Sequence, residues 1–204
     1  MILIKKKSEP HSLTIYKKTI NASFDNQPSK VKEDLRKSLL EEQGYICAYC
    51  MKRIEESADI KIEHYEARNS TNELSYKNLL AVCKGNEGSS KERQTCDTQK
   101  GNQILHIDPQ KLGDISTIFF TRNGEVKSTN SIFQRDLDEV LNLNDEFGKL
   151  IPARKSALKV LQRKITPMNK NKIEKLYNEL KTSERKIEYV GILLWYLENK
   201  IDNN

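Results

Sequence analysis

The sequence lacks a hydrophobic run long enough to cross a membrane. Its most apolar segment, residues 189–197, has nine residues and includes the single tryptophan, whereas a membrane-spanning helix needs about 20. The apolar run of residues 1–4 is likewise too short for a secretory signal peptide. We therefore expect a cytoplasmic protein without membrane contact, and we interpret residues 189–197 as core or as a surface that a partner helix covers.

The sequence also lacks a glycine-rich phosphate loop, so it contains no recognisable nucleotide site. Any dependence on ATP would have to come from a partner protein. Internal repeats and low-complexity segments are absent, which excludes a repeat architecture. Long basic runs with aromatic stacking partners, typical of single-strand binders, are absent as well.

Positive charge is present in excess. The chain carries a net charge of +6 with 31% charged residues, and residues 151–204 contain 12 Lys and Arg against six Asp and Glu, which equals the whole excess. This imbalance indicates either a face that contacts phosphates or a solvated helix surface. The basic residues at helical spacing are Arg154, Lys155, Lys159, Arg163 and Lys164.

All four cysteines lie in one block between Cys47 and Cys96. The pair Cys47-Ala-Tyr-Cys50 has the spacing that lets two thiolates hold one tetrahedral ion, and Cys83 and Cys96 would complete a zinc site. Reduced cysteines without a metal and disulfides are the alternatives, but a chain of this length can bury a core without disulfides. Twelve polar residues separate Cys83 from Cys96, and we expect them to form an inserted loop.

Local patterns around the cysteines predict a strand, a loop, a second strand and a helix. Residues 59–65 alternate apolar and polar side chains, residues 66–77 are rich in loop formers, and residues 79–83 are continuously apolar. Asp97 lies at a helix start, and we expect this helix to continue through Lys100 to about Leu105.

The remaining sequence predicts an N-terminal helix and a helical C-terminal region. A short strand is expected at residues 13–16, and a hairpin is expected around Arg122-Asn-Gly. Helices are expected over residues 28–42, 132–142, 145–164 and 171–200, the last broken near Thr182. We therefore predict an α+β fold with three parts, residues 1–43, 44–110 and 111–204.

The cysteine block resembles the HNH nuclease motif, and more closely the HNH nucleases of Septu and retron-associated antiphage defence systems, the PtuB group. The resemblance covers residues 40–109 and rests on Cys-Ala-Tyr-Cys, Ile-Glu-His-Tyr, Asn-Leu-Leu-Ala-Val-Cys and the widely spaced Cys-Asp-x-x-Lys-Gly-Asn. It implies a zinc-stapled ββα core and a nuclease that works beside a larger, PtuA-like ATPase. It implies four structural zinc ligands, Cys47, Cys50, Cys83 and Cys96, and four catalytic positions, Glu63, His64, Asn78 and Asp97.

The residue types at these positions fit phosphodiester hydrolysis. His64 is suited to be the general base, since an unperturbed imidazole titrates near neutral pH. Glu63 and Asp97 could ligate a catalytic Mg²⁺ or Mn²⁺, which prefer oxygen ligands. Asn78 could fix the imidazole or hold the loop, and Lys100 could contact a substrate phosphate or only belong to a charged helix face.

Two positions depart from the usual motif, because Glu63 stands where Asp is usual and Asp97 stands where His or Asn is usual. Two carboxylates favour a hard cation such as magnesium. Neighbours on a strand point to opposite faces, so Glu63 and His64 can share one ion only if the strand breaks or bulges there.

We expect nucleic acid to be the substrate, DNA rather than RNA. No sequence preference is readable, because HNH cores contact mainly the backbone. The alternatives to a nuclease are a non-catalytic zinc-ribbon module that binds nucleic acid and a structural subunit of a defence complex.

Overall fold

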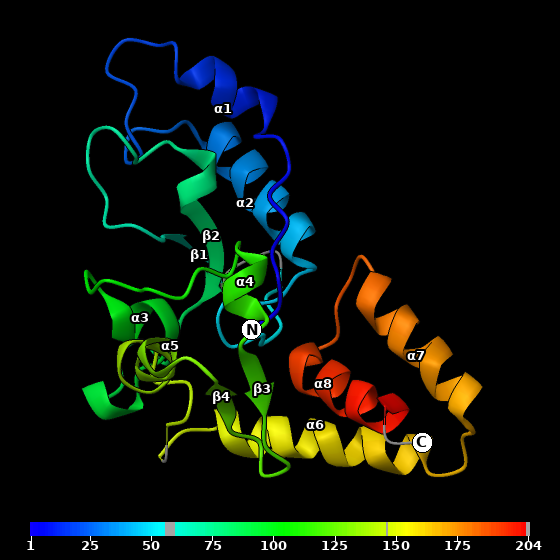
Figure 1. The fold of residues 1–204 in the computed structure, drawn as a ribbon. Helices are drawn as coiled ribbons and strands as arrows, with labels where there is room; N and C mark the ends of the chain where they lie inside the picture. The colour runs from blue at the N-terminus through cyan, green and yellow to red at the C-terminus, as the bar shows by residue number, and fades with distance from the viewer. Residues whose placement is uncertain (56–59, 146, 203–204) are drawn as a thin grey trace.

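The computed structural model describes residues 1–55, 60–145 and 147–202, and these form an α+β fold. Two small antiparallel sheets, β1–β2 and β3–β4, lie among the helices (Figure 1). Buried side chains from the whole length of the chain form one hydrophobic core. No helix in the described ranges has the length and apolar character that crossing a membrane would require.

The N-terminal part contains α1 (His11–Tyr16) and α2 (Ser29–Gln43). Helix α2 confirms the predicted helix: Val31, Leu35 and Leu39 recur on its buried face, and Gly44 ends it in a left-handed conformation with φ 68°. The predicted strand at residues 13–16 is wrong. Pro10 precedes a helix there, and Leu13 and Tyr16, three residues apart, both reach the core.

The middle part confirms the predicted order of strand, loop, strand and helix. Strand β1 (Ile60–His64) pairs antiparallel with β2 (Leu79–Cys83), so that Glu63 lies opposite Leu80. The expected first strand residue, Asp59, lies outside the described residues. Two short 3₁₀ turns, η1 (Tyr76–Asn78) and η2 (Lys91–Arg93), interrupt the loops. Helix α3 (Cys96–Lys100) and helix α2 both contact β2.

Helix α3 is shorter than predicted. It ends at Lys100 because Gly101 follows with φ 52°, and residues 103–108 form no regular element. His106 lies in this irregular segment, where its Nδ1 is 3.1 Å from Asp136 Oδ1.

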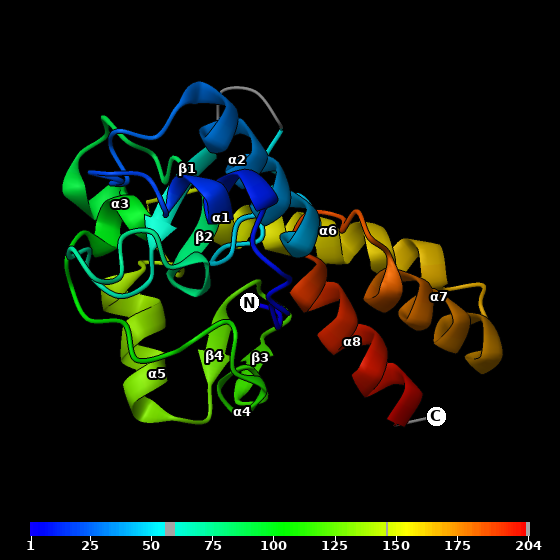
Figure 2. The same ribbon diagram turned by 90° about the horizontal axis from the view of Figure 1, so that it is seen from above.

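The C-terminal part begins with α4 (Leu112–Ile115) and the predicted hairpin, whose strands are β3 (Ile118–Phe120) and β4 (Val126–Ser128). The remaining helices are α5 (Ser131–Arg135), a π-helical turn η3 (Asp136–Val140), α6 (Leu150–Ile165), α7 (Lys170–Thr182) and α8 (Val190–Asp202). Helix α8 packs against both α6 and α7, and these three helices extend away from α1 and α3 (Figure 2).

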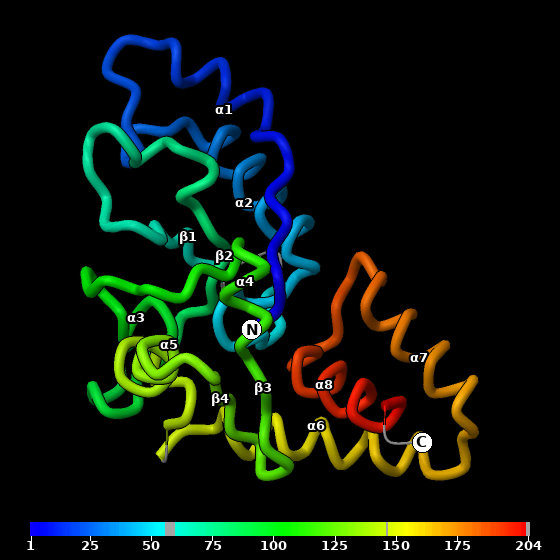
Figure 3. The backbone as a smooth tube through the Cα atoms, viewed as in Figure 1, coloured from blue at the N-terminus to red at the C-terminus, as the bar shows by residue number. Residues whose placement is uncertain are grey.

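The C-terminal helices are anchored to the turn that carries Cys47 and Cys50. The Tyr189 N–H donates to the Met51 carbonyl at 3.0 Å, and the Gly191 N–H approaches Met51 Sδ at 3.3 Å. A Cβ at Gly191 would lie 2.8 Å from that sulfur, so a larger residue there would force the Met51 side chain to shift. The N-terminal segment also runs into the centre, beside α4 and β3 (Figure 3), where the Ile4 N–H donates to the Pro109 carbonyl at 2.8 Å.

Arg154 does not belong to a basic surface, because its side chain is only 1% exposed. It donates to the carbonyls of Gly124 at 2.6 Å and Leu143 at 2.7 Å and so connects α6 to the hairpin. Arg154 is therefore not available to contact phosphate, contrary to the expectation from its helical spacing with Lys155 and Lys159.

Candidate metal centre and active site

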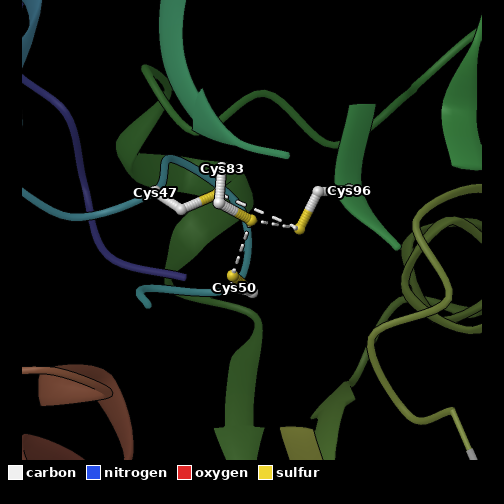
Figure 4. Close-up of side chains that lie close together, drawn as sticks. All are labelled: Cys47, Cys50, Cys83 and Cys96. Atoms are coloured by element: carbon white, nitrogen blue, oxygen red, sulfur yellow. Dashed lines mark hydrogen bonds between the residues drawn. The ribbon is translucent and has the colours of Figure 1, made fainter. Parts of the chain in front are cut away.

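The four cysteine sulfurs gather at one point in the core (Figure 4). Sulfur–sulfur distances are 3.8 Å for Cys47–Cys96, 3.7 Å for Cys50–Cys83 and 3.8 Å for Cys83–Cys96, and all four atoms lie within 4.8 Å of one another. A tetrahedral ion with Zn–S bonds of about 2.3 Å would separate its sulfurs by about 3.8 Å. These four buried cysteines can hold a metal ion such as zinc, and they are free thiols, not disulfides.

Local backbone structure explains why the four sulfurs meet. The turn that carries Cys47 and Cys50 closes when the Cys47 N–H donates to the Lys52 carbonyl at 2.9 Å, and the Lys52 N–H points at Cys50 Sγ at 3.5 Å. Cys83 is the last residue of β2 and Cys96 is the first of α3.

The loop between Cys83 and Cys96 closes at its base, where the Thr95 N–H donates to the Gly85 carbonyl at 2.9 Å. A Cβ at Gly85, whose φ is 54°, would lie 2.0 Å from the Thr95 carbonyl oxygen, so only glycine fits this contact. The inserted loop therefore leaves both ligands in place, as the sequence predicted.

The cluster favours a thiolate. Burial alone would raise the pKa of Cys47, but hydrogen bonds from the thiols of Cys50, Cys83 and Cys96 lower this pKa well below its usual value. The pKa values of Cys50 and Cys96 are raised well above the usual value, chiefly by their hydrogen bonds to Cys47. A thiolate is the form of cysteine that binds metal.

Glu63 and His64 end strand β1 and follow its alternation. The ladder with β2 is continuous through His64, so β1 has no bulge there. Lys61 and Glu63 face α3, where they meet Asp97 and Lys100. His64 instead packs against Phe24, with ring centroids 4.6 Å apart in an edge-to-face arrangement.

The imidazole of His64 is held by one backbone group. Its Nε2 lies 3.0 Å from the Glu73 carbonyl oxygen, and because a carbonyl only accepts, Nε2 must carry the proton. Burial lowers the pKa of His64, which favours the neutral ring. In the neutral ring Nδ1 is then the basic nitrogen, as a general base requires.

Asn78 holds the loop between the strands and does not line the surface cavity that contains His64. Its side chain accepts from the Glu66 N–H at 2.8 Å and donates to the Glu66 carbonyl at 3.1 Å. The Asn78 carbonyl also accepts from the Tyr65 N–H at 2.9 Å. Of the two roles expected for this residue, the contacts fit loop fixation.

The two carboxylates are each paired with a lysine. Glu63 Oε1 lies 2.7 Å from Lys100 Nζ, and Asp97 Oδ2 lies 2.9 Å from Lys61 Nζ. Burial and the neighbouring Asp97 raise the pKa of Glu63 to about 8, although the Lys100 ammonium opposes this shift. Lys100 is 2% exposed, so its ammonium group pairs with Glu63 and does not face solvent.

One surface cavity of about 300 Å³ brings most of the predicted site together. Glu63, His64, Asp97 and Lys100 all line it, and Arg68 adds a cation at its edge. Within the described residues, the cysteine cluster is the one group of three or more His, Cys, Asp and Glu side chains that converges tightly enough to hold a metal ion. Glu63 and Asp97 therefore offer a pair of oxygen ligands but not a complete set.

Two contacts of this site were not predicted. Tyr49, inside the Cys-x-x-Cys turn, donates its hydroxyl to Glu63 Oε1 at 3.3 Å and so links the cysteine cluster to the cavity. Lys61 pairs with Asp97. Residues two apart on a strand face the same side, so the position of Lys61 two residues before Glu63 was the sequence signal that could have placed it in the site. No sequence pattern pointed to Tyr49.

Neither the models of protein families nor the curated proteins compared with this chain gave a match.

Proposed function

We propose that this chain is a metal-dependent HNH-type endonuclease that hydrolyses phosphodiester bonds in nucleic acid. The observation that carries the proposal is the position of His64. It ends β1 of a ββα unit, its ring is fixed by a backbone carbonyl, and it lines the same cavity as Glu63 and Asp97. A binding ribbon would need the cysteines but not this combination of side chains.

In the proposed reaction His64 removes a proton from water through Nδ1. The water oxygen forms a bond to phosphorus while the bond from phosphorus to the leaving sugar oxygen breaks, and that oxygen takes a proton from solvent. Glu63 and Asp97 would hold Mg²⁺ or Mn²⁺, which would stabilise the developing negative charge. Since Lys100 and Lys61 occupy these carboxylates, the ammonium groups must first be displaced.

In this proposal zinc fills the cysteine site and has a structural role. The four thiols are buried and leave no open coordination position for substrate, as in structural zinc sites. We further propose that the chain is the nuclease effector of an antiphage system, works with a PtuA-like ATPase and prefers DNA.

The test compares cleavage of plasmid DNA and total RNA with Mg²⁺, with Mn²⁺ and with EDTA, in the presence and absence of the ATPase partner. Metal-dependent cleavage should disappear in His64→Ala. The matched control is His11→Ala, an exposed histidine on α1 outside the cavity. Zinc content and melting temperature must be equal in all three proteins.

A non-catalytic nucleic-acid-binding module is the second candidate. The specific observation that favours it is that each carboxyl group of the cavity is already paired with a lysine. Such a module would bind nucleic acid equally well in wild type and His64→Ala, and it would cleave nothing under any of these conditions. A structural subunit would neither bind nor cleave nucleic acid.

A further inference from the structure

A second cavity adjoins the one that contains His64. Its volume is about 360 Å³, and Phe24 and Ile62 line both cavities. Residues of α2 and β1 supply most of its other walls, including Lys32, Arg36 and Lys61. Ligand sites in proteins commonly have about 300–1,000 Å³.

Gln27 lines this second cavity and lacks the partners that a buried amide normally has. The side chain is 5% exposed, and within the described ranges neither its Oε1 nor its Nε2 has a hydrogen-bond partner. Buried polar groups are almost always hydrogen-bonded, and an unpaired one requires an explanation. A ligand that supplies both a donor and an acceptor would satisfy the two atoms.

The charges around Gln27 favour an anion. Lys32 and Arg36 contribute two cations, whereas Lys61 is paired with Asp97 at 2.9 Å. The one carboxylate in the lining, Asp25, is already bonded to Arg68 at 2.8 Å. Arg36 is exposed, and across the described residues no ion pair occupies it. Phosphate groups are the ligands that such cations contact in nucleic acids.

We infer that the second cavity binds the nucleotide adjacent to the scissile phosphate. Lys32 and Arg36 contact the backbone phosphate, and the Gln27 amide pairs with a donor and an acceptor on the base edge. Phe24, fixed against His64, forms the wall over which the strand passes between the two cavities. This inference rests on the proposed nuclease function, because that function places the scissile phosphate beside His64.

The test measures binding in a His64→Ala background, so that no substrate is cut. Fluorescence anisotropy with labelled oligonucleotides of each base composition would be recorded over a salt series, for the parent and for added Lys32→Ala, Arg36→Ala and Gln27→Met. Lys37→Ala is the matched control, because Lys37 also lies on α2 but lines neither cavity. Thermal melting would verify that each variant is folded.

Lys32→Ala and Arg36→Ala should weaken binding to all sequences and lower the slope of log affinity against log salt by about 1 each. Gln27→Met should change the preference among bases by on the order of 10-fold. The inference is overturned if Arg36→Ala and Gln27→Met bind like Lys37→Ala, or if the parent binds no oligonucleotide. If wild type cleaves nothing but Arg36→Ala still loses affinity, the nuclease proposal fails while the binding site stands.

Discussion

Removal of the metal from the four-cysteine site should unfold the protein. The ligands come from three separate elements, the turn at residues 47–50, the end of β2 and the start of α3, and all four thiols are buried. Structural zinc sites have apparent binding free energies of about 10–16 kcal/mol. The net free energy of unfolding of a domain is about 5–15 kcal/mol. The binding free energy lost with the metal is therefore as large as the net stability of the whole fold.

Direct spectroscopy would test the geometry behind this expectation. Sulfur–sulfur distances of 3.7–3.8 Å correspond to four metal–sulfur bonds of about 2.3 Å around a tetrahedral zinc ion. X-ray absorption at the zinc edge should therefore report four sulfur neighbours at that distance, with no nitrogen or oxygen.

The stability assay would follow helical circular dichroism during thermal melting, before and after treatment with a strong zinc chelator. Chelation should abolish the cooperative transition, and added zinc should restore it while added magnesium should not. Cys83→Ser should behave like the chelated protein. A metal-free protein that melts at the same temperature as the purified one, with four thiols protected from reagents, would refute this reasoning.

Three further substitutions test single contacts. Lys100→Met removes the cation that opposes the raised pKa of Glu63, so in urea unfolding it should lower stability mainly as the pH rises past about 8. The exposed Lys37→Met should change stability by under about 0.5 kcal/mol at every pH, and equal effects of the two substitutions would contradict a buried pair. Asn78→Ala removes two hydrogen bonds to the Glu66 backbone and should cost about 0.5–1.5 kcal/mol for each, so an unchanged urea midpoint would count against its loop contacts. Gln27→Met removes an unpaired buried amide and should raise stability by about 1 kcal/mol without ligand, whereas a lower melting temperature would show that the amide is already bonded.

Short-range patterns predicted the parts of the fold that depend on neighbouring residues. Alternating apolar and polar residues predicted β1, a continuous apolar run predicted β2, and Gly44 predicted the end of α2. The prediction at residues 13–16 was wrong because four residues cannot distinguish one turn of helix from a strand, and the burial of Leu13 and Tyr16 against α2 decides the outcome.

The candidate site also has features that local sequence patterns predicted and features that depend on tertiary packing. Cysteine spacing predicted the cluster, and the motif order predicted that Glu63, His64 and Asp97 would line one cavity. The pairing of Lys100 with Glu63 could not be predicted, because it depends on how α3 packs against β1. Gln27 lies far from the cysteine block in sequence, and no local pattern connects it to the site.

Because the C-terminal helices are anchored on the cysteine turn, the rate at which the protein is degraded in a cell should depend on whether that turn holds a metal. The carbonyl of Met51, next to Cys50, holds the segment that leads into α8, and Arg53 donates to the Lys186 carbonyl. If zinc fills the cysteine site as we propose, a chain that has not yet acquired it would therefore present loosened C-terminal helices to proteases. Degradation would select against unmetallated copies, so the amount of intact protein would follow the metal supply during synthesis.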